Sequence, residues 1–77
     1  MLSNKKMKKL LERTTGKAVH VSSIQETSDT YLGRLTIEGE PGRVYFGSGW
    51  DGHEARGSAL RTALHAIDPE AYTRHCL

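Results

Sequence analysis

The spacing of hydrophobic residues changes twice along this 77-residue chain, and this change limits the fold more than any other feature. Near both ends, apolar side chains recur every three or four residues, which is typical of one buried helix face. Over residues 17–25 and 31–38 they alternate with polar ones, as in half-buried β-strands. A chain of this length holds one domain. The pattern therefore predicts a single domain over residues 1–77, in the order helix, three strands, helix.

Capping residues predict where the helices begin and end. Ser3 is placed to cap a helix that runs to about Thr14, and Gly16 can take the left-handed position that follows a helix. Asp51 and Glu54 form the D-x-x-E pattern of a capping box before a second apolar stripe. The Asp68-Pro69 step stops that helix and allows a short third helix over residues 69–75.

The middle of the chain predicts three strands, over residues 17–25, 31–38 and 43–47. The segment Gly39-Glu40-Pro41-Gly42 is a strong hairpin signal between the last two strands. Gly47-Ser48-Gly49 is interpreted as a tight turn before the second helix. The expected outward side chains of the second and third strands are Leu32, Arg34, Thr36, Arg43 and Tyr45.

Both apolar helix stripes have to be buried, and one face of the sheet is the simplest place for them. We therefore expect an α+β fold, α-β-β-β-α, with a three-stranded antiparallel sheet and two helices packed on one of its faces. The predicted core draws on every element: Leu10, Leu11, Val19, Val21, Leu35, Ile37, Val44, Phe46, Ala59, Ala63, Leu64 and Ile67.

Composition and charge restrict the kinds of function that the chain could have. Charged residues make up 26% of the chain and hydrophobic residues 36%, which is ordinary for a folded domain. No apolar run is long enough to span a membrane. The single cysteine, Cys76, excludes an intrachain disulfide and favours a reducing, cytoplasmic location. Six basic residues stand against one glutamate in the first 17 positions, which points to an acidic partner.

The segment from Gly47 to Leu64 resembles the double-stranded-RNA-binding domain. The matching residues are Gly47, Gly49, Glu54, Ala55, Ala59, Ala63 and Leu64, and Arg56 stands where that family has a lysine. The resemblance implies the fold given above. It also implies that the first helix and the start of the second contact a duplex.

Two contact regions depart from that family. Gly52 and His53 replace the lysine pair that the family directs at phosphates. The turn over residues 26–30 is acidic and lacks the family's Gly-Pro-x-His loop. These departures favour a protein partner over a nucleic acid.

Two functions follow from these patterns. The first is a small non-catalytic binding module, a bacterial or phage regulator or inhibitor that docks on the acidic surface of a larger protein, such as a nucleic-acid enzyme. The alternative is binding of duplex nucleic acid through the basic first helix and the start of the second. The candidate binding residues are Lys5, Lys6, Lys8, Lys9, Arg13, Arg34, Arg43, Tyr45, Trp50, His53 and Arg56.

Catalysis and metal binding have little support in the sequence. His65, His75 and Cys76 lack the spacing of a structural zinc site, so no metal or cofactor is expected. Neither Ser22 nor Ser48 has the nucleophile-elbow motif or the orienting third residue of a catalytic serine. The chain is therefore predicted not to be an enzyme.

Overall fold

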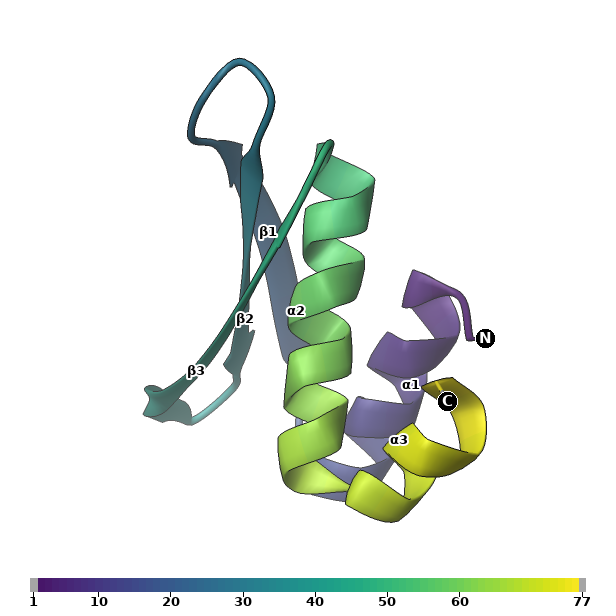
Figure 1. The fold of residues 1–77 in the computed structure, drawn as a ribbon. Helices are drawn as coiled ribbons and strands as arrows, with labels where there is room; N and C mark the ends of the chain where they lie inside the picture. Colours follow the sequence, from purple (N-terminus) through teal and green to yellow (C-terminus); the bar gives the residue numbers. More distant parts are fainter. Residues whose placement is uncertain (1, 77) are drawn as a thin grey trace.

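All helices lie on one side of a single three-stranded sheet (Figure 1). The computed structural model describes residues 2–76. The elements are α1 (Asn4–Thr15), β1 (Val19–Gln25), β2 (Tyr31–Ile37), β3 (Glu40–Gly49), α2 (Gly52–Ile67) and α3 (Pro69–Cys76). The sheet is antiparallel, in the order β1-β2-β3. The predicted fold class is confirmed.

The helix ends form at the predicted capping residues. The Ser3 hydroxyl accepts a hydrogen bond from the Lys6 N–H at 3.2 Å, and Gly16 takes the left-handed conformation with φ of 71°. The Asp51 carboxylate accepts from the Glu54 N–H at 2.8 Å. Each bond satisfies a backbone group that a helix end leaves without an intrahelical partner.

The core lies between the sheet and the helices. α2 crosses the inner face of the sheet, α1 packs against α2 and the start of β1, and α3 packs against α2. The buried cluster consists of Met7, Leu11, Val19, Leu35, Ile37, Ala59, Leu60, Ala63, Leu64 and Ala71. Leu10, Val21 and Ile67 pack against it from partly buried positions. Ten of the twelve predicted core residues are thus in the core or against it.

The predicted orientation of β3 is wrong. Tyr45 pairs with Leu35 and packs against the core, although it is predicted to face outward. Phe46 pairs with Arg34 on the opposite face and is 50% exposed, although it is predicted to be buried. Val44 lies on the same outer face as Phe46, where it is half-buried.

The reversal comes from an irregularity next to the β2–β3 turn. Ile37 pairs with Glu40, but the preceding residue, Thr36, pairs with Val44. Residues 41–43 are therefore extra on β3. An odd number of extra residues moves every later side chain to the other face of the strand. Pro41 also has no N–H to donate, which favours such a break in the ladder.

Three glycines on the inner face allow α2 to lie directly on the sheet. A Cβ at Gly33 would lie 2.0 Å from the Ala55 carbonyl oxygen, and one at Gly47 would lie 2.4 Å from the Ala59 nitrogen. Gly49 would bring a Cβ within 2.6 Å of the Ala55 nitrogen. The predicted turn over residues 47–49 is therefore wrong. These residues continue β3, and their glycines give the helix backbone room.

Candidate functional site

The structure distributes the predicted binding residues over several places. The basic residues of α1 and His53 lie on the helix side of the sheet, whereas Arg34 lies on the opposite side. Arg43 and Tyr45 are neighbours near the β2–β3 turn. Trp50 follows the end of β3. Arg56 belongs to α2, and its side chain reaches across to β1. They therefore do not form one continuous surface.

The basic residues of α1 form a ridge, hereafter the α1 ridge. Its members are Lys5, Lys6, Lys8, Lys9 and Arg13. All are exposed except Lys8, which is half-buried. The ion pairs within residues 2–76 join other residues, so the ridge keeps its positive charge there. Such a ridge attracts an anionic partner.

A side-chain bond joins the first turns of α1 and α2. The Asn4 side-chain amide donates to the His53 carbonyl oxygen at 3.0 Å. The bond places His53 beside the first turn of α1. Sequence reasoning missed Asn4, because only the tertiary fold brings these two residues together.

The first turn of α2 is occupied by its own carboxylates. Asp51 accepts from the Glu54 N–H, and Glu54 accepts from the Trp50 N–H at 3.1 Å. Free N–H groups at a helix start are what a phosphate would bind. Here the Asp51 carboxylate takes one of these N–H groups, that of Glu54, and both carboxylates repel an anion, so this end of α2 is a poor phosphate site.

Arg56 is held by the sheet. Its guanidinium donates to the Ser23 hydroxyl at 2.8 Å, and the side chain is half-buried. The bond joins α2 to β1 across the edge of the inner face. Arg56 therefore has a structural contact within the domain.

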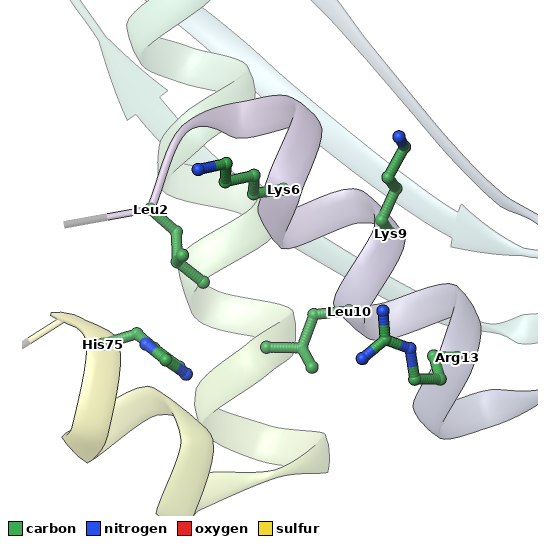
Figure 2. A pocket seen from close by; sticks show the side chains of 6 residues that line it. All are labelled: Leu2, Lys6, Lys9, Leu10, Arg13 and His75. Carbon is green, nitrogen blue, oxygen red and sulfur yellow. The ribbon is translucent and has the colours of Figure 1, made fainter.

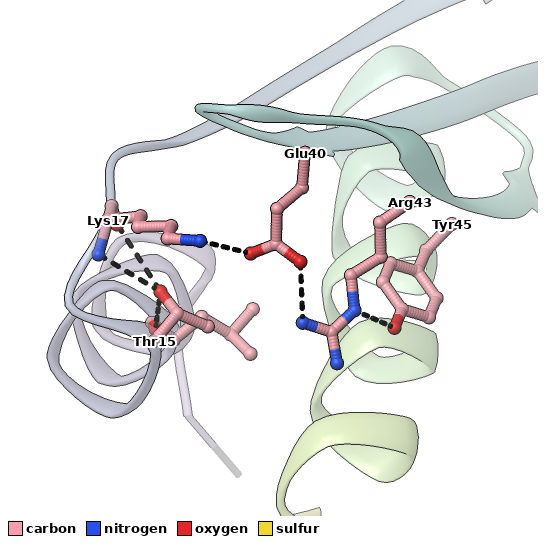
Figure 3. A network of polar contacts seen from close by, with 6 residues as sticks. Thr15, Lys17, Glu40, Arg43 and Tyr45 are labelled. Atoms are coloured by element: carbon pink, nitrogen blue, oxygen red, sulfur yellow. Dashed lines mark hydrogen bonds and ion pairs between the residues drawn. The ribbon is translucent and has the colours of Figure 1, made fainter.

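A polar network lies near the β2–β3 turn, where β3 begins (Figure 3). Glu40 accepts from Lys17 at 3.0 Å and from Arg43 at 3.1 Å, and Arg43 also donates to the Tyr45 hydroxyl at 3.1 Å. The hydrogen bond from Lys17 is the main reason why the pKa of Glu40 is lowered. The bond to Tyr45 is the main reason why the pKa of Arg43 is raised. Arg43 and Tyr45 thus already have partners.

The outer side of the sheet has no helix on it, and we call this surface the open face. Along each strand, its side chains alternate with those that point to the helices. They are His20, Ser22, Ile24, Leu32, Arg34, Thr36, Val44, Phe46 and Ser48. Ile24 is 64% exposed, and Leu32 pairs with it across the strands. Sequence reasoning missed Ile24 and Phe46. The alternation His20, Ser22, Ile24 was the signal that could have placed Ile24 outward.

Trp50 is 74% exposed, more than any other large hydrophobic residue in the described part of the chain, residues 2–76. It follows the end of β3 and, with Thr30, Ser48 and Glu54, lines a shallow groove of about 280 Å³. Ser48 also belongs to the open face, so the groove adjoins that surface. Trp50 therefore extends the apolar surface beyond the strands.

Other kinds of site find no support within residues 2–76. No group of three His, Cys, Asp or Glu side chains there is arranged to hold a metal ion. The helices of the same segment are too short or too polar to cross a membrane. Cys76 is a free, half-buried thiol. No family model matches the chain, and neither the curated proteins nor the solved structures that were compared with it contain a match.

Proposed function

We propose that this chain is a non-catalytic protein-binding module whose open face docks on an acidic surface of a larger protein, which it regulates. One observation carries this proposal. Among residues 2–76, the large hydrophobic residues that remain exposed, Ile24, Phe46 and Trp50, lie on or next to the sheet face that no helix covers. Exposed apolar surface of this kind is typical of interaction sites.

The arrangement of the open face supports a protein as partner. Leu32 and Arg34 lie on the central strand between Ile24 on β1 and Phe46 on β3. Aromatic and arginine side chains dominate the binding energy of protein interfaces when they become desolvated. Phe46 beside Arg34 on the open face fits this pattern.

The charge on the open face supports an acidic partner. None of its nine side chains is a carboxylate. His20 is paired at 2.8 Å with Glu38 in the neighbouring turn. Arg34, the other basic side chain of the open face, has no ion pair among residues 2–76. A carboxylate of the partner would pair with Arg34 and make docking specific.

A capture experiment with paired variants tests the proposal. Immobilised wild-type protein should retain a single partner protein from a lysate after nuclease treatment. The double variant Ile24→Thr/Phe46→Thr should lose that partner. Lys5→Ala/Lys9→Ala is the matched control, because it changes two exposed residues on the other side of the sheet. Capture that survives the threonine changes, or that nuclease abolishes, would contradict docking through the open face.

Duplex binding through the α1 ridge remains the second candidate, because the ridge is exposed and has no ion pair within residues 2–76. Each lysine that contacts a phosphate releases a counterion, so log affinity falls with log salt by about 0.9 per contact. In that case Lys5→Ala/Lys9→Ala should flatten the slope by about two units. Micromolar duplex binding in physiological salt that these changes abolish would favour this function over the first.

A further inference from the structure

A second concave surface lies on the helix side, between α1 and α3. Both helices pack on α2 rather than on each other, and a groove of about 210 Å³ remains between them. Its walls are formed by Leu2, Lys6, Lys9, Leu10, Arg13 and His75. Figure 2 shows Leu2, Leu10 and His75 directed into the space between the helices. The Lys6 amine and the Arg13 guanidinium lie at its two ends, while Lys9 points away from α3.

The groove combines an apolar centre with cationic ends. Leu2 and Leu10 are half-buried, so they form a recessed floor. Within residues 2–76, no carboxylate lines the groove, and neither Lys6 nor Arg13 has an ion pair. The groove is smaller than typical small-molecule sites of roughly 300–1,000 Å³. It therefore suits one apolar side chain with negative charges on both sides.

We infer that this groove binds an acidic segment of a protein, in which one large apolar side chain is flanked by carboxylates. The apolar side chain contacts Leu2 and Leu10. The carboxylates on either side pair with Lys6 and Arg13, whose cationic groups lie at opposite ends of the groove. A protein segment offers both kinds of group in one short stretch, with the apolar side chain between two carboxylates.

The same geometry argues against two other anionic partners. A membrane-bound helix inserts large exposed apolar residues into the lipid, but the leucines here are recessed and the exposed residues around them are cationic. A duplex presents phosphates and gains nothing from a leucine floor. Charge complementarity alone would fit all three partners, and the apolar floor selects the peptide.

This inference is independent of docking through the open face, because the two surfaces lie on opposite sides of the sheet (Figure 1). The probe is a fluorescein-labelled synthetic peptide in which glutamates flank one central leucine. Its binding is measured by fluorescence anisotropy. Ile24→Thr/Phe46→Thr should leave its affinity unchanged, so failure of one proposal does not imply failure of the other.

The groove itself is tested by removing the two positive charges at its ends. Lys6→Gln/Arg13→Gln should weaken binding of the peptide about tenfold, because two charge pairs are lost. The matched control is Lys5→Gln/Arg74→Gln, which removes the same charge from exposed positions outside the groove. The control should weaken binding less than about twofold. Circular dichroism of both variants checks that they fold, which is expected because all four side chains are exposed.

The role of the groove's apolar centre is tested by changing the peptide that binds to it. Replacing its central leucine by serine should weaken binding to the wild-type protein about tenfold, because burial of the leucine side chain is lost. Equal losses in the groove and control variants would overturn the inference, as would undiminished binding of the serine peptide. Tighter binding of an RNA duplex or of phosphatidylserine vesicles, lost in Lys6→Gln/Arg13→Gln, would replace the peptide as the occupant.

Discussion

The two faces of the sheet carry opposite kinds of side chain. The inner face has glycine at positions 33, 47 and 49, where α2 lies closest, although it is the buried face. The outer face carries Ile24 and Phe46, although it is open. Burial alone would predict the reverse. The difference shows that the distance between α2 and the sheet is determined by backbone contact, whereas Ile24 and Phe46 lie outside the buried cluster.

The inner face is itself divided. Glycines of β2 and β3 lie beneath the first half of α2, near Ala55 and Ala59. Farther along the helix, Leu60 and Leu64 are fully buried in the core with Leu35. The first half of α2 is thus stabilised by close backbone approach and the second by side-chain packing. The open face contributes to neither, and the following predictions test this division.

The largest effect is expected at the close approach. Gly33→Val would place its Cβ against the Ala55 carbonyl, and a helix backbone cannot rotate away as a side chain can. The free energy of unfolding should fall by at least about 4 kcal/mol, above the usual cost of overpacking. Denaturant unfolding measures it. Gly42→Ala, where a Cβ would meet nothing within 4 Å, is the control and should change stability by less than about 0.5 kcal/mol.

The second half of α2 should be destabilised by removing a side chain rather than by adding one. Leu64 is 0% exposed, so Leu64→Ala leaves a cavity. We expect a loss of about 3 kcal/mol in the free energy of unfolding. Chemical denaturation of both proteins gives the difference. A loss below about 0.5 kcal/mol would mean that side-chain packing does not stabilise this half of the helix.

The open face should tolerate substitution. Phe46→Thr keeps a residue that favours strands and removes an aromatic ring that is 50% exposed. The free energy of unfolding should change by less than about 1 kcal/mol. The thermal midpoint, compared with that of Leu64→Ala, provides the measurement. A loss as large as that of the leucine variant would show that the outer face also stabilises the domain.

The smallest effect is expected at the polar network near the β2–β3 turn, and it depends on pH. The pKa of Glu40 in the folded protein is lowered from its ordinary value of 4.5, mainly by the hydrogen bond from Lys17. Ionised Glu40 therefore stabilises the fold above about pH 4.5, and this contribution disappears as pH falls through the lowered pKa. The stability difference between wild type and Glu40→Gln should be present at pH 7 and vanish in acid. A difference that grows on acidification would contradict this sign.

Local chemistry made much of the fold predictable. Ser3, Gly16 and Asp51 determine helix ends through contacts within a few residues, so these could be read directly from the sequence. The order and pairing of the strands followed from alternation. The face of β3 did not, because Val44, Tyr45 and Phe46 are three consecutive apolar residues and show no alternation. The extra residues at 41–43 then decided the orientation.

The candidate sites were predictable to a lesser extent. The α1 ridge follows from helical spacing and was recognised. The bond between Arg56 and Ser23 joins residues 33 positions apart, and only the packing of α2 on β1 reveals it. Glycines gave an ambiguous signal, since Gly47 and Gly49 are equally compatible with a turn and with a close helix contact. The groove between α1 and α3 depends on two helices that meet only through α2.

The position of α1 also bears on how the domain assembles during synthesis. Met7 and Leu11 share the buried cluster with residues of α2, which the ribosome makes only after all three strands. At roughly 5–20 residues per second, α1 waits several seconds for its partner. The sheet has no such delay, because each strand pairs with its immediate neighbour in sequence. The first helix made is thus among the last elements to dock.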